Sequence, residues 1–211
     1  CIAPDYIMVQ RDLKDAFVRE FRSAVSALLG VHPEESPYYG RIVSDRAFQR
    51  IVSYLSEGEV LAGGHYDENT RFMEPTLLGD VSLDSTVMQD EIFGPVFPVL
   101  VYDDLGDVEG FVNSRPKPLA LYYFGEERTG WEFVRRTSSG GACINDTIMH
   151  IANPALPFGG VGNSGMGHYH GKESFLAFSH TRSVLCSPRR FDVPFRYMPY
   201  RLFGLVKKLL G

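Results

Sequence analysis

The feature that most constrains the fold is the regular alternation of short apolar runs with amphipathic stretches. The runs at 95–102 and 119–124 are rich in valine, leucine and aromatic residues on both faces, which is typical of parallel strands that helices cover on both sides. A helical pattern follows each of them, at 105–113 and 131–137. This alternation predicts an α/β fold with a mostly parallel sheet and covering helices.

The remaining elements are consistent with that class. Apolar residues recur at helical spacing over 12–29, before Gly30, and Ser44 is placed to cap a second helix. Further strands are expected at 2–10, 59–62, 73–78 and 141–144. Residues 156–167 hold five glycines among twelve, so this segment is expected to be a loop whose backbone approaches its neighbours closely.

The end of the chain differs from the rest, so we divide the chain into a catalytic domain, 1–180, and an appendage, 181–211. The appendage is expected to contain an oligomerisation strand at Ser183 to Cys186 and an amphipathic tail helix at 199–210. Apolar side chains occupy one arc of that helix and basic ones the other, which suits either a membrane surface or docking on protein.

Composition excludes several classes of protein. Among 211 residues, 21 Lys and Arg stand against 26 Asp and Glu, a net charge of -5, whereas a nucleic-acid partner favours a basic surface. No apolar run approaches the ~18 residues of a membrane span, so we expect a cytoplasmic protein with at most peripheral membrane contact. Three scattered cysteines give no reason to expect disulfides. The histidines at 150, 168, 170 and 180 lack zinc spacing, so we expect them to hold loops through hydrogen bonds and not to bind a metal. Because the sequence begins with Cys, we expect a partial chain.

Three segments could carry chemistry. Cys1 is a potential nucleophile, although a lone cysteine is more often an inert apolar residue. Glu91 and Phe93 precede a buried strand, so both could lie at a sheet edge that binds a ligand. Alternatively, Glu91 is a solvated acid and Phe93 is a core residue. A Gly-x-Gly-x-x-Gly match within 156–167 lacks a strand before it and an acid about 20 residues after it, which argues against a dinucleotide fingerprint.

Taken together, the motifs resemble the aldehyde dehydrogenase superfamily and, within it, the class 3 branch of fatty and aromatic aldehyde dehydrogenases. The resemblance spans almost the whole chain. It is carried by residues 1–6, 87–95, 117–122, 137–141, 156–167 and 169–172.

This resemblance implies roles for single residues. Cys1 would be the catalytic nucleophile, Glu91 would hold the nicotinamide-side ribose, and Phe93 would pack by the nicotinamide. Phe158 would line the aldehyde pocket, and Asn145 would lie nearby without an assigned role. The implied reaction is the oxidation of an aldehyde with NAD or NADP through a cysteine thiohemiacetal and thioester.

The resemblance also implies what this sequence lacks. The family's Rossmann domain, general-base glutamate and oxyanion asparagine all precede the cysteine, so we expect the isolated chain to be inactive and the parent enzyme to be a homodimer. Two alternatives remain: an amidohydrolase with an N-terminal cysteine nucleophile, and a non-catalytic dimerisation fragment.

Overall fold

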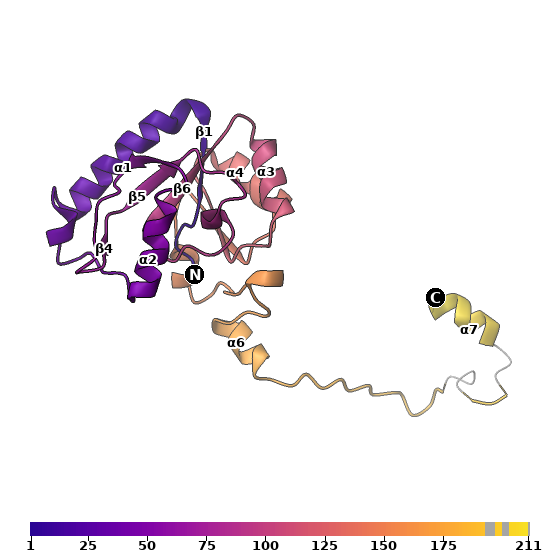
Figure 1. Cartoon of the computed structure of the whole chain (residues 1–211). Coiled ribbons are helices and arrows are strands. Elements are labelled where there is room, and N and C mark those ends of the chain that lie inside the picture. The colour runs from indigo at the N-terminus through magenta and orange to yellow at the C-terminus, as the bar shows by residue number, and fades with distance from the viewer. Residues whose placement is uncertain (193–196, 200–202, 211) are drawn as a thin grey trace. The chain divides into compact units, whose positions relative to one another are not determined.

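A computed structural model describes residues 1–192, 197–199 and 203–210. The chain forms two compact units, Cys1–Ala177 and Phe178–Gly211. Figure 1 shows the first unit as helices arranged around a twisted sheet. The four strands of this sheet follow the order β1-β6-β5-β2, and they span β1 (Ile7–Gln10), β2 (Glu59–Ala62), β5 (Thr76–Gly79) and β6 (Val96–Tyr102).

The strand pairing confirms the mostly parallel sheet. The central strand β6 pairs in parallel with β1 and with β5, while β2 is antiparallel to β5. A second, two-stranded sheet joins β7 (Ala120–Tyr123) in parallel to β8 (Gly141–Ile144). A short hairpin joins β3 (Tyr66–Asp67) and β4 (Phe72–Met73). Parallel sheets of this kind disfavour the amidohydrolase alternative, which would require stacked antiparallel sheets.

Helices cover both faces of the main sheet. Along β6, Phe97 and Val99 pack in a cluster with α1 (Lys14–Leu29). Val96 and Leu100 lie in the cluster that contains α2 (Asp45–Tyr54). Because side chains alternate between the faces of a strand, an apolar residue is needed at every position of β6. The predicted buried central strand is therefore confirmed.

The remaining helices pack near β7 or follow β8. Val108 and Val112 of α3 (Leu105–Ser114) share a cluster with Phe133 of α4 (Glu127–Arg136). The helix expected at 131–137 in fact begins at Glu127, because its first turn is polar and shows no apolar periodicity. Short elements that the sequence did not predict are α5 (Met149–Ala152), α6 (Gly171–Ala177) and the 3₁₀ turns η1 (Arg11–Leu13), η2 (Pro33–Glu35), η3 (Thr86–Met88) and η4 (Gly162–Ser164).

Two expected strands are shorter than predicted because proline lacks the amide hydrogen that a ladder needs. The first strand begins at Ile7 rather than residue 2, and Pro4 lies in the stretch before it. The strand expected at 73–78 is divided at Pro75 between β4 and β5. In contrast, 59–62 and 141–144 have the predicted bounds.

The second unit bears on the two predictions for the end of the chain. The expected strand at Ser183 to Cys186 is not formed, and Val184 and Leu185 are exposed. A strand needs a neighbour, and the described part of the chain offers this segment none. The tail helix α7 spans Phe203–Leu210, and the predicted positions 200–202 lie outside the described residues. No helix in the described part of the chain has the length and apolarity that a membrane crossing requires.

Candidate active site

The candidate nucleophile Cys1 lies before β1, and its side chain is 74% exposed. Two contacts from distant parts of the chain hold the segment 1–6. The Tyr122 hydroxyl donates a hydrogen bond to the carbonyl oxygen of Ile2. The Asp5 carboxylate accepts one from the backbone N–H of Ile92 at 2.9 Å. The position of Cys1 thus depends on β7 and on the loop before β6, both of which are far away in the sequence.

Glu91 lies beside Cys1. The backbone nitrogen of Cys1 is 3.6 Å from Glu91 Oε1. Arg50 of α2 donates from its guanidinium to the carbonyl oxygens of Glu91 and Ile92, at 3.3 and 2.7 Å. Hydrogen bonds from a charged donor are among the stronger ones in proteins, so Arg50 fixes the backbone that carries Glu91. The structure therefore brings together two residues that are separated by almost half of the chain.

Asp5 is a site residue that the sequence did not single out. Burial raises the pKa of its carboxyl, the hydrogen bond from Ile92 opposes that rise, and the charge of Glu91 adds to it. Protonation would remove the negative charge that strengthens the bond to Ile92. The hydrogen bond from the Ile92 N–H to Asp5, which joins segment 1–6 to the loop that carries Glu91, is therefore weaker at acidic pH.

Phe93 is held in an unusual conformation. Its φ of +50° lies in the left-handed region, which bulky residues rarely adopt. Such backbone costs about 1–3 kcal/mol and clusters at ligand-binding segments. The neighbouring Ile92 is buried, while Phe93 is 67% exposed. Ile92 therefore fills the core, and the interpretation of Phe93 as a core residue is wrong.

Phe158 belongs to a cluster of aromatic rings. Its ring centroid lies 5.6 Å from that of His150, 5.7 Å from that of Tyr169 and 6.1 Å from that of His170. The ring of His150 in turn contacts Tyr122 edge to face at 6.0 Å. Since Tyr122 bonds to Ile2, only two side chains separate Phe158 from the segment that carries Cys1.

His150 is the second site residue that the sequence did not single out, because the histidines at 150, 168, 170 and 180 were expected only to hold loops by hydrogen bonds. It is buried, and burial lowers the pKa of its imidazole. Its Nδ1 lies 3.3 Å from Cys143 Sγ, while its Nε2 has no hydrogen-bond partner. The neutral ring of His150 therefore belongs to the aromatic cluster around Phe158.

Asn145, which follows β8, and the glycine-rich loop are both held by close contacts with the backbone. Asn145 accepts from the Gly125 N–H at 2.8 Å and donates to the Gly125 carbonyl at 3.0 Å, so Asn145 has a structural role. Any Cβ at Gly160 would lie 2.0 Å from the carbonyl oxygen of Ser164. This confirms the predicted close backbone approach in the glycine-rich loop.

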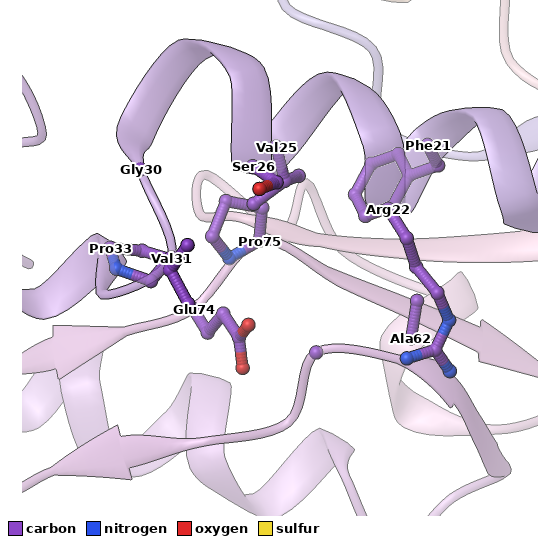
Figure 2. A pocket seen from close by; sticks show the side chains of 11 residues that line it. Phe21, Arg22, Val25, Ser26, Gly30, Val31, Pro33, Ala62, Glu74 and Pro75 are labelled. Atoms are coloured by element: carbon purple, nitrogen blue, oxygen red, sulfur yellow. The ribbon is translucent and has the colours of Figure 1, made fainter.

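A separate cavity of about 190 Å³ lies between α1 and the loops that follow it. Figure 2 shows Arg22 of α1 and Glu74 at this cavity, with Phe21 and Pro75 nearby. None of its lining residues contributes to the contacts around Cys1, Glu91 or Phe158. This cavity is therefore separate from the candidate site residues Cys1, Glu91 and Phe158. Among the described residues, no group of three or more acidic, histidine or cysteine side chains is arranged to hold a metal.

Known proteins resemble this chain closely. The mouse dimeric NADP-preferring aldehyde dehydrogenase is 46% identical over 186 residues, which are 88% of this chain and 41% of that protein. Rat aldehyde dehydrogenase family 3 member B1 is 43% identical over 95% of this chain and 43% of its own length. A solved structure of AldH from Staphylococcus aureus in a substrate-bound state has a TM-score of 0.85 and 42% identity, covering all of this chain and 47% of that one.

These matches agree with the residues from which the site is built. The chain spans less than half the length of the relatives that it matches. The model of the aldehyde dehydrogenase family matches residues 1–184, a range that includes Cys1, Glu91, Phe93 and Phe158. By its family match and by its similarity to family 3 relatives, the chain belongs to the aldehyde dehydrogenase family.

Proposed function

We propose that the intact protein oxidises aldehydes to carboxylic acids with NAD or NADP and that Cys1 is the nucleophile. The thiolate sulfur forms a bond to the carbonyl carbon, and the adduct then loses hydride, two electrons and one proton, to NAD(P). Water cleaves the resulting thioester, so that the acid leaves and the thiol is restored. Aldehyde-dependent reduction of NAD(P) by the intact enzyme tests the reaction, and its absence would contradict it.

One observation supports this function most: Cys1 and Glu91 are neighbours in space although they lie far apart in sequence. A thiol that attacks a carbonyl has to lie near the nicotinamide that accepts the hydride. Glu91 is the proposed ligand of the ribose attached to that nicotinamide. The half-exposed carboxylate can accept bonds from hydroxyl groups. The exposed ring of Phe93 offers a flat apolar face. These residues fit a nicotinamide cofactor.

The proposed substrate class rests on the aromatic cluster around Phe158. Phe158, His150 and Tyr169 present aromatic rings, and burial keeps His150 neutral. An apolar aromatic wall favours fatty or aromatic aldehydes over small charged ones. We assign Phe158 to the aldehyde pocket on this basis.

The chain provides only part of such a site. A general base that activates water and a donor that stabilises the oxyanion are expected in segments preceding Cys1 in the parent enzyme. We therefore propose residues 1–180 as a partial catalytic domain with little turnover by itself. Two functions can still reside in residues 181–211: dimerisation and contact with a membrane surface.

Dimerisation is expected to depend on the segment around Val184 and Leu185. These apolar side chains are 77% and 87% exposed, and an extended edge of this kind gains hydrogen bonds by pairing with a strand of a second copy. The intact enzyme should sediment as a dimer at micromolar concentration, whereas Leu185→Asp should shift it to monomers. Arg182→Ala is the matched control. A monomeric wild type would contradict the prediction.

The tail helix α7 is expected to bind anionic membrane surfaces. Phe203 and Leu205 are exposed, and Lys207 and Lys208 stand in the last turn. Each lysine near an anionic surface contributes about 1 kcal/mol, so Lys207→Gln with Lys208→Gln should lower partitioning at least about tenfold. Liposome flotation of the intact enzyme measures this, with neutral liposomes and deletion of residues 195–211 as controls. Equal recovery of all forms would mean that the helix docks on protein instead.

A further inference from the structure

Tyr122 has a position that neither the proposed reaction nor its cofactor explains. It lies in the third position of β7, and its hydroxyl donates to the carbonyl oxygen of Ile2, the residue after Cys1. The ring of Tyr122 contacts the ring of His150 in α5, with the two centroids 6.0 Å apart. Tyr122 thus contacts both residues 1–6, the nucleophile segment that carries Cys1, and the segment around α5.

The nucleophile segment needs contacts of this kind. Residues 2–6 precede the first ladder of the sheet, so no strand pairing sets their backbone. The Asp5 contact with Ile92 holds this segment on the side of Glu91. The Tyr122 contact holds it close to Cys1 itself. A carbonyl that is partly buried loses its only strong interaction when its donor is removed, so loss of this hydroxyl would free the peptide next to the thiol.

The turn that leads into α5, the helix that carries His150, is strained. Ile148 has a φ of +66°, which is a clear outlier for a β-branched residue. Such backbone persists only where its surroundings hold it. The ring of Tyr122 also packs against His150, and His150 packs against Phe158. Tyr122 therefore contacts both the nucleophile segment and the wall of the proposed aldehyde pocket.

We propose that Tyr122 is a positioning residue that sets the Cys1 thiol relative to the pocket wall formed by residues 148–158. This inference rests on the proposed function only for the identity of the reaction. Burial raises the pKa of the Tyr122 hydroxyl, so the phenol keeps its proton at neutral pH and remains a donor to Ile2. Tyr122 touches neither hydride nor aldehyde in this role.

The test is Tyr122→Phe in the intact enzyme, with Tyr123→Phe as the matched control. Tyr123 is the next residue of β7, and its ring packs instead on Phe133 at 5.9 Å. The burst of NAD(P)H formation, measured per cofactor-binding site, should fall roughly tenfold in Tyr122→Phe, the effect of one lost hydrogen bond. The dissociation constant for NAD(P) should stay within about twofold, and Tyr123→Phe should resemble wild type.

A second measurement separates this inference from the proposed function. Alkylation of Cys1 by iodoacetamide, followed by mass spectrometry of its peptide, needs neither aldehyde nor cofactor. Its rate should differ at least about threefold between wild type and Tyr122→Phe, and not in Tyr123→Phe, because the orientation of the thiol changes. An unchanged burst and an unchanged alkylation rate would overturn the positioning role. Altered alkylation in an enzyme that never reduces NAD(P) would support the role of Tyr122 and overturn the proposed function.

Discussion

Replacing Cys1 by serine in the intact enzyme is expected to lower aldehyde oxidation by a factor on the order of 10⁴ or more. A serine hydroxyl is not ionised near neutral pH, whereas a cysteine thiol can be, and the thiolate is the attacking species. The change removes little volume, and the Cys1 side chain is largely exposed in this chain. The loss should therefore appear in kcat while the protein stays folded and binds NAD(P).

The matched control is Cys186→Ser. Cys186 is also exposed, but it belongs to the unit Phe178–Gly211, whereas Cys1 and Glu91 belong to the unit Cys1–Ala177. Its substitution should leave the oxidation rate within about twofold of wild type. Substantial aldehyde oxidation by Cys1→Ser would remove Cys1 from the mechanism.

The second large effect is expected for Glu91→Gln, which should slow hydride transfer roughly 10- to 100-fold. The amide retains the size of the carboxylate but replaces one acceptor oxygen by a donor and removes the negative charge, so the ribose hydroxyls lose their charge-assisted bonds and are held less firmly. Small displacements of reacting groups cost rates of this order. Stopped-flow formation of NAD(P)H measures the step, while hydrolysis of the thioester should be little affected.

Asp90→Asn is the control for this experiment. Asp90 precedes Glu91 and is exposed, and the loop contacts made by Arg50 and Asp5 involve Glu91 and Ile92 instead. The control should therefore transfer hydride at the wild-type rate. An unchanged rate in Glu91→Gln itself would identify Glu91 as a solvated surface acid.

The parts of the fold that local pattern determines could be predicted from the sequence. The buried strand β6 was evident because it is apolar on both faces, and residues of both faces pack in core clusters. The helix α1 was evident from its apolar spacing and from Gly30 at its end. The segment at Ser183 to Cys186 shows strand propensity but pairs with no strand in the described part of the chain, because a strand also needs a neighbour, so its pairing with a second copy stays a prediction.

The candidate site could be predicted from the sequence only in part, for a related reason. Cys1 and Glu91 were found through motifs, and the structure brings them together. Asp5, Tyr122 and His150 gave no separate signal, because their importance lies in contacts with residues far along the chain. Tyr122 reads as an ordinary strand residue until the position of Ile2 is known.

The most direct test of the central claim is to trap the acyl group on the enzyme. The intact enzyme would be mixed with an aromatic aldehyde and NAD(P), quenched in acid during turnover, digested and analysed by mass spectrometry. We expect the acyl group of the product acid on the Cys1 thiol in wild type, and none in Cys1→Ser, because the thioester is the last covalent species before water attacks. Acylation of Cys143 or Cys186 instead, or NAD(P) reduction without any acylated cysteine, would contradict the account.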